Sequence, residues 1–383
     1  MRRKTFIKTG SGLLVSGVLG NVMSTSCSKI NTYPKYEGKR LIILRLDGGH
    51  DGLFAFLPAN NEYIAKRRPQ LFKRTVEKGI AYENDWVLHQ NLSIIDELSQ
   101  KNQAKLIPFL GYPEPNTSHF KSAEIWETGV LPQESKGIKE GWIGKNLTRT
   151  NISKTNLHYP VIALHENKTL FDKIKEHEAF TWVDKSLSHQ YLDEIPALLE
   201  LLEKTQNYPI QDYVKKQLEN QLTQMKWLTQ IEPRKIHYTS DLNRQLNWAS
   251  ELINNDYPYQ VIHTHLGGFD THLGQPQRLE ELYLDLNESL TEFIHSISMT
   301  HWPNTCIWIY SEFGRTIDEN KNLGTDHGFG GLGMILSGDE SFLEMIKVKT
   351  NAGNSFENSP LIYAPVFNDF RTIYEKLQAF ISS

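Results

Sequence analysis

Two pairs of acidic and imidazole side chains have the clearest capacity for chemistry in this sequence. Asp270 and His272 lie two positions apart in the segment GFDTH, and Asp326 and His327 are neighbours in GTDHG. Hard divalent metals take carboxylate oxygens as ligands, and zinc or manganese also accepts imidazole nitrogen. On an extended segment, side chains two positions apart point to one side. The pairs therefore indicate a metal site, with a hydrogen-bonded loop network as the alternative.

Further charged residues follow two apolar runs. Asp47 and Asp51 come after RLIILRL, and Glu312 and Arg315 belong to SEFGRT at the end of another run. The aspartates are candidate metal ligands. An arginine can clamp an oxyanion through two hydrogen bonds, which makes Arg315 a candidate catalytic residue. Glu312 would orient this arginine or bind metal, and a structural Glu–Arg pair is the alternative.

A hydroxyl group and an imidazole are adjacent in the segment NTSHF. Ser118 would be a nucleophile if a metal ion lowered the pKa of its hydroxyl, or if His119 accepted its proton. Serine is also a favoured helix N-cap, and the residues that follow, FKSAEIWE, have a helical pattern. The catalytic role and the capping role are compatible.

Other histidines and a cysteine are interpreted mainly as structural. His263 and His265 alternate along one apolar run and share a face, and His265 is also a candidate metal ligand. His89 precedes a capped helical pattern. Cys306 opens an apolar run, as expected for a small buried hydrophobic residue.

The elements that must position these residues are short apolar runs that alternate with amphipathic segments. Near-continuous apolar runs are typical of strands buried on both faces. Their alternation with helical patterns predicts an α/β fold with a mainly parallel sheet, whose carboxyl edge gathers functional residues. The runs lie near residues 40–49, 104–113, 159–165, 259–268, 305–314 and 330–338, and clear helical patterns span 92–102 and 278–297. Residues 185–256 are strand-free and amphipathic, which predicts a helical insertion.

Composition excludes several classes of protein. The chain has 383 residues, 39% hydrophobic and 22% charged, which fits neither a disordered chain nor a multi-span membrane protein. A formal net charge of −4 lacks the basic character of a nucleic-acid binder. The two cysteines, Cys27 and Cys306, form neither a thiolate zinc finger nor a disulfide framework.

The first 26 residues have the pattern of an export signal. A basic start, MRRKTFIK, precedes a small and apolar stretch that is too short to span a membrane. The match to a twin-arginine (Tat) signal is imperfect, so the Tat and Sec routes are both open. Cys27 follows small residues, which permits lipid attachment, and a plain cleaved leader is the alternative. Residues 27–39 have the composition of a tether, and residues 40–383 form the predicted domain.

Several of these motifs together resemble an exported bacterial family known as domain of unknown function 1501. The resemblance covers about residues 40–383 and rests on LRLDGGHDGLFAFLP, PNTSHFKSAEIWETG, GWIGKNL, LGGFDTH, SEFGRT and GTDHG. The family is considered a distant relative of the alkaline phosphatase/sulfatase superfamily. The resemblance implies an alkaline phosphatase/sulfatase-like α/β fold, in which helices sandwich a central, mainly parallel sheet. It also implies one or two divalent metal ions, which would be Zn, Mn, Ca or Mg.

The resemblance also implies roles for individual residues. Asp51, or else Asp47, is similar to the metal-binding aspartate after the first strand, and Ser118, or else Thr117, is similar to the nucleophile. The implied ligands of the two ions are Asp270 with His272, and Asp326 with His327.

The chain departs from the superfamily in one respect. No histidine follows His327, whereas the superfamily usually has a further metal-binding histidine late in the chain. One ion site is then incomplete, or it is completed by Glu312 or His265.

We therefore expect an exported, metal-dependent hydrolase of phosphate or sulfate esters that acts on a small-molecule or glycan substrate. Its location would be the periplasm or cell envelope, with membrane attachment if Cys27 carries a lipid. A non-catalytic cell-envelope binding or assembly protein of the same fold is the alternative. A secreted isomerase or mutase of the superfamily is a third interpretation, and no nucleic-acid partner is expected.

Overall fold

The computed structural model describes most of the chain from Tyr33 onward, which forms one unit, Tyr33–Ser383. The described residues are 33–131, 133–134, 140–149, 160–165, 180–181, 194–201, 203–204, 209–231, 237–350 and 362–383. The predicted leader, Cys27 and parts of the predicted insertion and tether lie outside these ranges.

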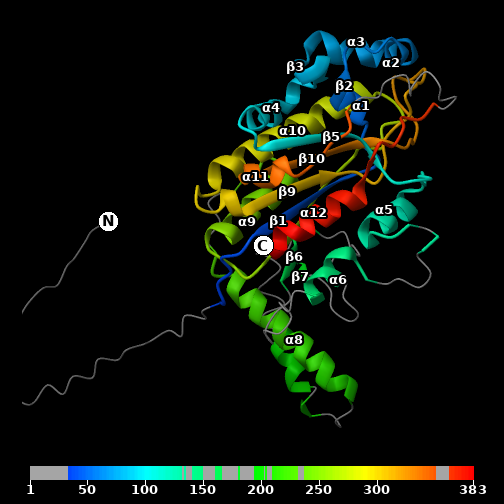
Figure 1. Ribbon diagram of the computed structural model, residues 1–383. Helices are drawn as coiled ribbons and strands as arrows, with labels where there is room; N and C mark the ends of the chain where they lie inside the picture. The colour runs from blue at the N-terminus through cyan, green and yellow to red at the C-terminus, as the bar shows by residue number, and fades with distance from the viewer. Residues whose placement is uncertain are drawn as a thin grey trace, which may run out of the picture. The chain divides into compact units, whose positions relative to one another are not determined.

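The central sheet contains the apolar runs that the sequence singles out (Figure 1). Its strand order in the described residues is β11-β5-β10-β9-β1-β8-β6-β7. Strand β10 runs antiparallel to both of its neighbours, and the other pairs are parallel. The prediction of a mainly parallel sheet is therefore confirmed. The strands are β1 Arg40–Asp47, β5 Ala104–Gly111, β6 Val161–Ala163, β7 Phe180–Thr181, β8 Val261–Gly267, β9 Thr305–Tyr310, β10 Gly331–Ser337 and β11 Asn368–Asp369.

Strand β1 shows why these runs lack the alternation of a half-exposed strand. It lies between β8 and β9, with Ile43 opposite both His263 and Trp308. Leu44 faces one hydrophobic cluster and Ile43 faces another, so both faces of the strand are buried. A strand covered on both faces needs apolar residues at nearly every position.

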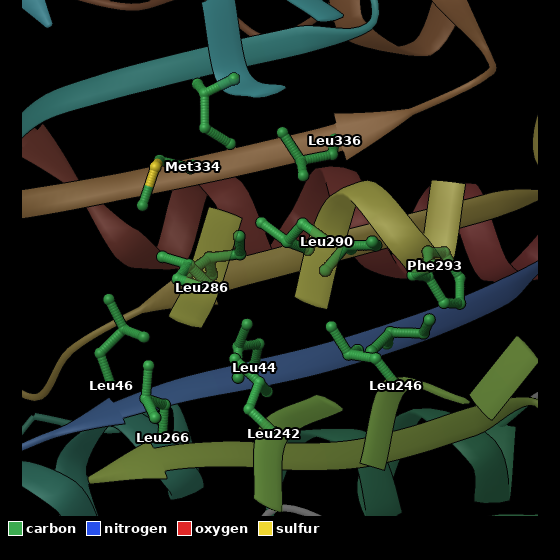
Figure 2. Close-up of a cluster of buried hydrophobic side chains, with 14 of the residues drawn as sticks. Leu44, Leu46, Leu242, Leu246, Leu266, Leu286, Leu290, Phe293, Met334 and Leu336 are labelled. Carbon is green, nitrogen blue, oxygen red and sulfur yellow. The ribbon is translucent and has the colours of Figure 1, made fainter. Parts of the chain in front are cut away.

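One face of the sheet is covered by long helices and by the N-terminal segments after β1. Figure 2 shows leucines of α9 and α10 packed against Leu44, Leu46 and Leu266 of the sheet. The amphipathic pattern of 278–297 therefore corresponds to a core-facing helix. The elements on this face include α1 Gly52–Ala55, α3 Pro69–Lys78, α4 Ser93–Gln100, α9 Asp241–Asn254 and α10 Gln275–Ser296.

The other face is covered by helices rich in aromatic residues (Figure 1). Trp126 stacks between Tyr310 of the sheet and Phe370, with ring centroids 4.9 and 4.3 Å apart. These contacts anchor the helix that begins at the NTSHF motif onto the sheet. The helices on this face are α5 His119–Thr128, α6 Trp142–Arg149, α11 Glu340–Glu344 and α12 Phe370–Ser382.

The remaining elements lie at the periphery or form a second, small sheet. The small antiparallel sheet has the order β2-β4-β3. Within the region predicted as a helical insertion, residues 194–201, α8 and α9 are helical, and α9 packs on α10 and β8. No helix among the described residues has both the length and the apolar character that a membrane span needs. The elements are β2 Phe56–Pro58, α2 Glu62–Arg67, β3 Ile80–Tyr82, η1 Glu83–Asp85, β4 Trp86–Leu88, η2 Gln90–Leu92, α8 Pro209–Leu228 and η4 Trp302–Asn304.

Candidate metal centre

The carboxyl edge of the sheet gathers polar residues from four segments of the chain. His119 begins α5 after β5, and Asp270 follows β8. Glu312 follows β9, and His327 lies in the connection from β9 to β10. These strand ends meet because β5, β8 and β9 run in the same direction. The position matches the expectation for functional residues in a parallel sheet.

Three histidines surround the carboxylate of Asp270. Potential ligand atoms of His119, Asp270 and His327 lie within 4.8 Å of one another. The Nε2 atoms of His272 and His327 lie 3.0 and 3.1 Å from Asp270 Oδ1, and His119 Nε2 lies 3.7 Å from Asp270 Oδ2. The side chain of Asp270 is 48% exposed, so the group is open to solvent.

Each of these imidazoles is held at its other nitrogen by an oxygen acceptor. His327 Nδ1 lies 2.8 Å from the backbone oxygen of Thr117. His119 Nδ1 lies 2.8 Å from Glu312 Oε1, and His272 Nδ1 lies 2.9 Å from Asp326 Oδ1. Carbonyl and carboxylate oxygens only accept hydrogen bonds, so each Nδ1 carries the proton. In the neutral rings, each Nε2 then presents a lone pair.

The Nε2 atoms of these imidazoles face the carboxylate of Asp270. His272 Nε2 and His327 Nε2 lie only 3.2 Å apart, and both face the same oxygen of Asp270. Two groups that only accept hydrogen bonds repel one another unless a proton or a cation lies between them. His119, Asp270 and His327 form the group whose ligand atoms could hold one ion, and His272 Nε2 lies 3.0 Å from the same aspartate. Imidazole nitrogen and carboxylate oxygen are both ligands of divalent zinc. Metal-binding histidines commonly donate their second N–H to a carboxylate or a carbonyl group, as all three do here. The residues present therefore fit a divalent metal ion.

Glycines allow the loops that carry the ligands to approach one another. Gly48 has φ +120°, and a Cβ atom at this position would lie 2.5 Å from the backbone nitrogen of Asp270. A Cβ atom on Gly324 would lie 2.1 Å from the carbonyl carbon of His272. Larger residues at either position would separate the loops, because these distances are shorter than any normal contact.

Arg315 connects the loops of the site through hydrogen bonds to their backbone oxygens. Its side chain has no exposed surface, and it donates hydrogen bonds to the backbone oxygens of Gly48, Gly49, Phe269 and Thr325. Its Nη2 atom also lies 2.6 Å from Asp270 Oδ1. Burial acts to raise the pKa of Asp270, but the hydrogen bond and charge of Arg315 hold that pKa below its ordinary value. The predicted catalytic role of Arg315 stays a prediction, and its contacts are with the protein backbone and Asp270.

Glu312 supports His119 from a buried position. The carboxylate accepts hydrogen bonds from the backbone N–H of Gly48 and the hydroxyl of Ser311, in addition to its contact with His119. The hydrogen bond from His119 to Glu312 raises the pKa of this histidine above its ordinary value, against the opposing effect of burial. Glu312, a predicted metal ligand, thus contacts the Nδ1 atom of His119, and its metal-binding role stays a prediction.

Ser118 lies next to the cluster in the sequence, between Thr117 and His119, which both contact residues of the cluster. It occupies the N-cap position of α5, but its side chain makes no capping hydrogen bond. The residue is exposed, and its neighbours Thr117 and His119 both belong to the hydrogen-bond network of the cluster. The predicted nucleophilic role of Ser118 stays a prediction.

Two predicted metal ligands have other partners. The side chain of Asp51 is 1% exposed, and it contacts Arg68 Nη1 at 2.9 Å and Gln275 Nε2 at 2.6 Å. Asp47 forms an ion pair with Arg45 and lies 3.3 Å from His265 Nδ1. Burial acts to raise the pKa of Asp47, but hydrogen bonds from His265 and Arg45 bring it below its ordinary value. The structure does not bring these two aspartates into the group around Asp270, and their metal-binding roles stay predictions.

Asp326 and His119 contact other groups than their predicted roles require, and both roles stay predictions. Asp326, predicted as a ligand, is 69% exposed and contacts His272 Nδ1. His119, predicted as a proton acceptor for Ser118, is one of the converging imidazoles. The only sequence signal for His119 as a ligand is its position after an apolar run, because a lone histidine at a helix start has no ligand spacing.

Sequence comparison identifies the family. The model of the family described as "Protein of unknown function (DUF1501)" matches residues 109–339, a range that includes all four converging residues. A search of curated proteins gives no match.

Solved structures with low sequence identity align with most of the chain. The lipoteichoic acid synthase LtaP from Listeria monocytogenes is 10% identical, with a TM-score of 0.34 and coverage of 81% of this chain and 70% of that one. The alkaline phosphatase from the Antarctic bacterium TAB5 is 11% identical, with a TM-score of 0.37 and coverage of 90% and 98%. The family match spans more than half of the sequence, and the chain belongs to the DUF1501 family.

Proposed function

We propose that this protein is a metal-dependent hydrolase of phosphate or sulfate esters. The observation that supports this proposal is the convergence of three imidazole Nε2 atoms on the carboxylate of Asp270. His119, Asp270, His272 and His327 would hold one divalent ion. A bound divalent ion polarises an ester oxygen and lowers the pKa of a nearby hydroxyl group.

The surroundings of the cluster favour an anionic ester over a neutral one. Ser118 is the N-cap of α5, so the free N–H groups and the positive dipole end of this helix lie next to it in the chain. A helix N-terminus is a favourable place for a phosphate or sulfate group. The exposed hydroxyl of Ser118 would act as the nucleophile beside that group.

Other residues of the chain would keep this arrangement fixed. Glu312 holds His119 by its Nδ1 atom, so that the Nε2 atom faces the ion site. Arg315 holds Asp270 and the loops on both sides of it. Such preorganisation lowers the cost of stabilising the charge that develops in the reaction.

Metal analysis and a panel of esters test the proposal. Purified protein, reconstituted with Zn, Mn, Ca or Mg, should bind about one equivalent of metal and hydrolyse a phosphate or sulfate monoester. Ser118→Ala should keep its metal and lose turnover by more than about 100-fold. Failure to retain any of these metals, or full activity of Ser118→Ala, would contradict the proposed site.

A non-catalytic binding or assembly protein of the cell envelope is the second candidate. It is favoured by the contact of Arg315 with Asp270, which gives the carboxylate a cationic partner without any metal. In that case, metal reconstitution would leave the melting temperature unchanged.

The location of the protein is part of the proposal. The pattern of residues 1–26 supports export to the periplasm or cell envelope, and Cys27 would anchor the chain if it is lipidated. Cell fractionation, together with mass spectrometry of the mature N-terminus, distinguishes a soluble exported form from a lipid-anchored one.

A further inference from the structure

The spacing of two loops sets the geometry of the candidate metal centre. The first loop, residues 268–274, carries Asp270 and His272, and the second loop, residues 323–328, carries His327. The Nε2 atoms of the two histidines, one from each loop, lie 3.2 Å apart. Side chains that hold one ion need to stay within about 0.5 Å of their working positions. A residue that fixes the distance between the two loops therefore acts on metal binding.

The side chain of Gln275, the first residue of α10, contacts both loops. This side chain is fully buried. Its Oε1 atom accepts a hydrogen bond from the hydroxyl of Thr271 at 3.0 Å and another from the hydroxyl of Thr325 at 2.6 Å. Thr271 belongs to the first loop and Thr325 belongs to the second loop. One carboxamide oxygen thus connects the two segments that carry the converging side chains.

The other end of the Gln275 carboxamide binds a buried ion pair. The Nε2 atom donates a hydrogen bond to Asp51 Oδ2 at 2.6 Å, and Asp51 in turn contacts Arg68 Nη1. A carboxylate only accepts hydrogen bonds, so the NH₂ group faces Asp51 and the oxygen faces the two hydroxyl groups. A flipped carboxamide would direct its oxygen at the carboxylate. The three partners together therefore fix the orientation of the Gln275 side chain.

Arg68 extends this set of contacts to the segment that pairs with the second loop. It donates hydrogen bonds to the backbone oxygens of Thr316 at 2.7 Å and Ile317 at 2.8 Å. The backbone N–H of Thr316 donates to the oxygen of Asp326 at 2.9 Å, and the Thr316 hydroxyl accepts from the N–H of Asp326 at 3.1 Å. The second loop is therefore connected to the same ion pair by two routes, one through Gln275 and one through Arg68.

We propose that Gln275 is a positioning residue of the metal centre, whose buried carboxamide fixes the first loop relative to the second. This inference rests on the proposed function, because it takes one ion to bind between side chains of the two loops. A backbone hydrogen bond of 3.1 Å from Thr325 to Thr271 already pairs the loops at one point. The carboxamide adds a connection through side chains and joins both loops to Asp51 and Arg68. Polar groups without solvent contact hold such a geometry firmly, because a broken hydrogen bond there is not replaced by water.

Matched substitutions of the two threonines test this inference. Thr271→Val/Thr325→Val removes both hydroxyl groups that bind Gln275 Oε1 and keeps the size of the side chains, whereas Thr271→Ser/Thr325→Ser keeps both hydroxyl groups. Competition with a chromophoric chelator measures zinc affinity. Loss of contacts that orient metal ligands typically costs about 10- to 100-fold in affinity, so we expect the valine variant to bind zinc about tenfold more weakly. The serine variant should stay within about twofold of the wild type, because it keeps these contacts.

Two further variants separate positioning from stability. Gln275→Met removes the carboxamide and should weaken zinc binding at least as much as the valine variant. Thr264→Val is the matched control, because Thr264 is equally buried and its hydroxyl donates to the backbone oxygen of Ile43 within the sheet, at 3.1 Å. This control also loses a buried hydrogen bond, so its metal-free form should melt at a lower temperature while its zinc affinity stays unchanged.

The possible results distinguish this inference from the proposed function. A purely structural role of Gln275 would lower the melting temperature of the metal-free valine variant and leave its zinc affinity at the wild-type value. That result, or equal losses of affinity in the valine and serine variants or in the valine variant and Thr264→Val, would overturn the positioning role and leave the proposed function standing. A wild-type protein that retains no divalent metal would overturn both.

Discussion

The Nε2 atoms of His272 and His327 lie 3.2 Å apart, and they lie 3.0 and 3.1 Å from the same carboxylate oxygen, Asp270 Oδ1. The Nη2 atom of Arg315 lies 2.6 Å from that oxygen. A divalent ion held by the two nitrogens would place its charge beside this carboxylate and beside the guanidinium group. Metal binding at this point therefore depends on how the carboxylate of Asp270 is shared between the ion and Arg315.

Removal of one converging imidazole should weaken metal binding strongly. We expect His327→Ala to lower zinc affinity by more than about 100-fold, because it deletes one of the four side chains that would hold the ion. Competition with a chromophoric chelator gives the affinity. The control is His301→Ala, which removes a histidine that is paired with Asp256 away from the cluster. Equal zinc affinity in the two variants would show that His327 is not a ligand.

The two carboxylates that hold Nδ1 atoms should differ in importance. The side chain of Glu312 is 5% exposed, whereas that of Asp326 is 69% exposed, so solvent screens only the second one. We expect Glu312→Gln to lower metal affinity by about tenfold, because the charge that holds His119 is lost. Asp326→Asn should lower it by less than about threefold. Calorimetric titration with zinc measures both, and the reverse order would mean that burial does not set the strength of these contacts.

The sheet could be predicted from the sequence because strands buried on both faces have near-continuous runs of apolar residues. The apolar runs that begin near Arg40 and Thr305 became β1 and β9, since neither strand has a solvent face that would require polar residues. The two-residue strands β7 and β11 and the three-residue members of the small sheet were not predicted. Their pairing depends on tertiary contacts, and so few residues carry no periodicity.

The candidate site could be predicted only in part. Asp270 and His327 follow buried strands, and the geometry of a parallel sheet brings such positions together. The same reasoning placed Asp51 in the site, because it also follows a strand. Its side chain instead points into the protein, where Arg68 from the start of α3 neutralises it. The partners of a carboxylate can be far from it in the sequence. The sequence alone therefore does not show whether a carboxylate binds a metal ion or forms a buried ion pair.

The buried pair of Asp51 and Arg68 should contribute to stability without contributing to metal binding. Both side chains are at most 1% exposed, and Asp51 also accepts hydrogen bonds from Gln275 and from the backbone of Leu53. Asp51→Asn would leave the guanidinium buried without a counter-charge, at a cost of about 3 kcal/mol in the free energy of unfolding. Urea unfolding measures this loss. Zinc affinity of the folded variant should be unchanged. A large fall in that affinity would show that Asp51 contributes to metal binding.

Acid should destabilise the protein through histidines that lie outside the site. Burial lowers the pKa of His89 to about 4, against about 6.5 in an unfolded chain. As the pH falls below 6.5, the unfolded state binds a proton that the folded state does not. The stability due to the neutral histidine is thus complete above pH 6.5 and is lost progressively toward pH 4. Between pH 7 and pH 5, this one residue should account for about 2 kcal/mol.

His89→Asn isolates this effect, because an asparagine oxygen can replace His89 Nδ1 as the acceptor for the backbone N–H of Asn91. Since asparagine does not titrate, the variant should lose about 2 kcal/mol less than the wild type between pH 7 and pH 5 in urea unfolding. The exposed His237→Asn is the control and should follow the wild type. If the His89 variant shows the full wild-type loss, the acid sensitivity arises elsewhere, with His50 as the next residue to substitute, because burial lowers its pKa to about 4 as well.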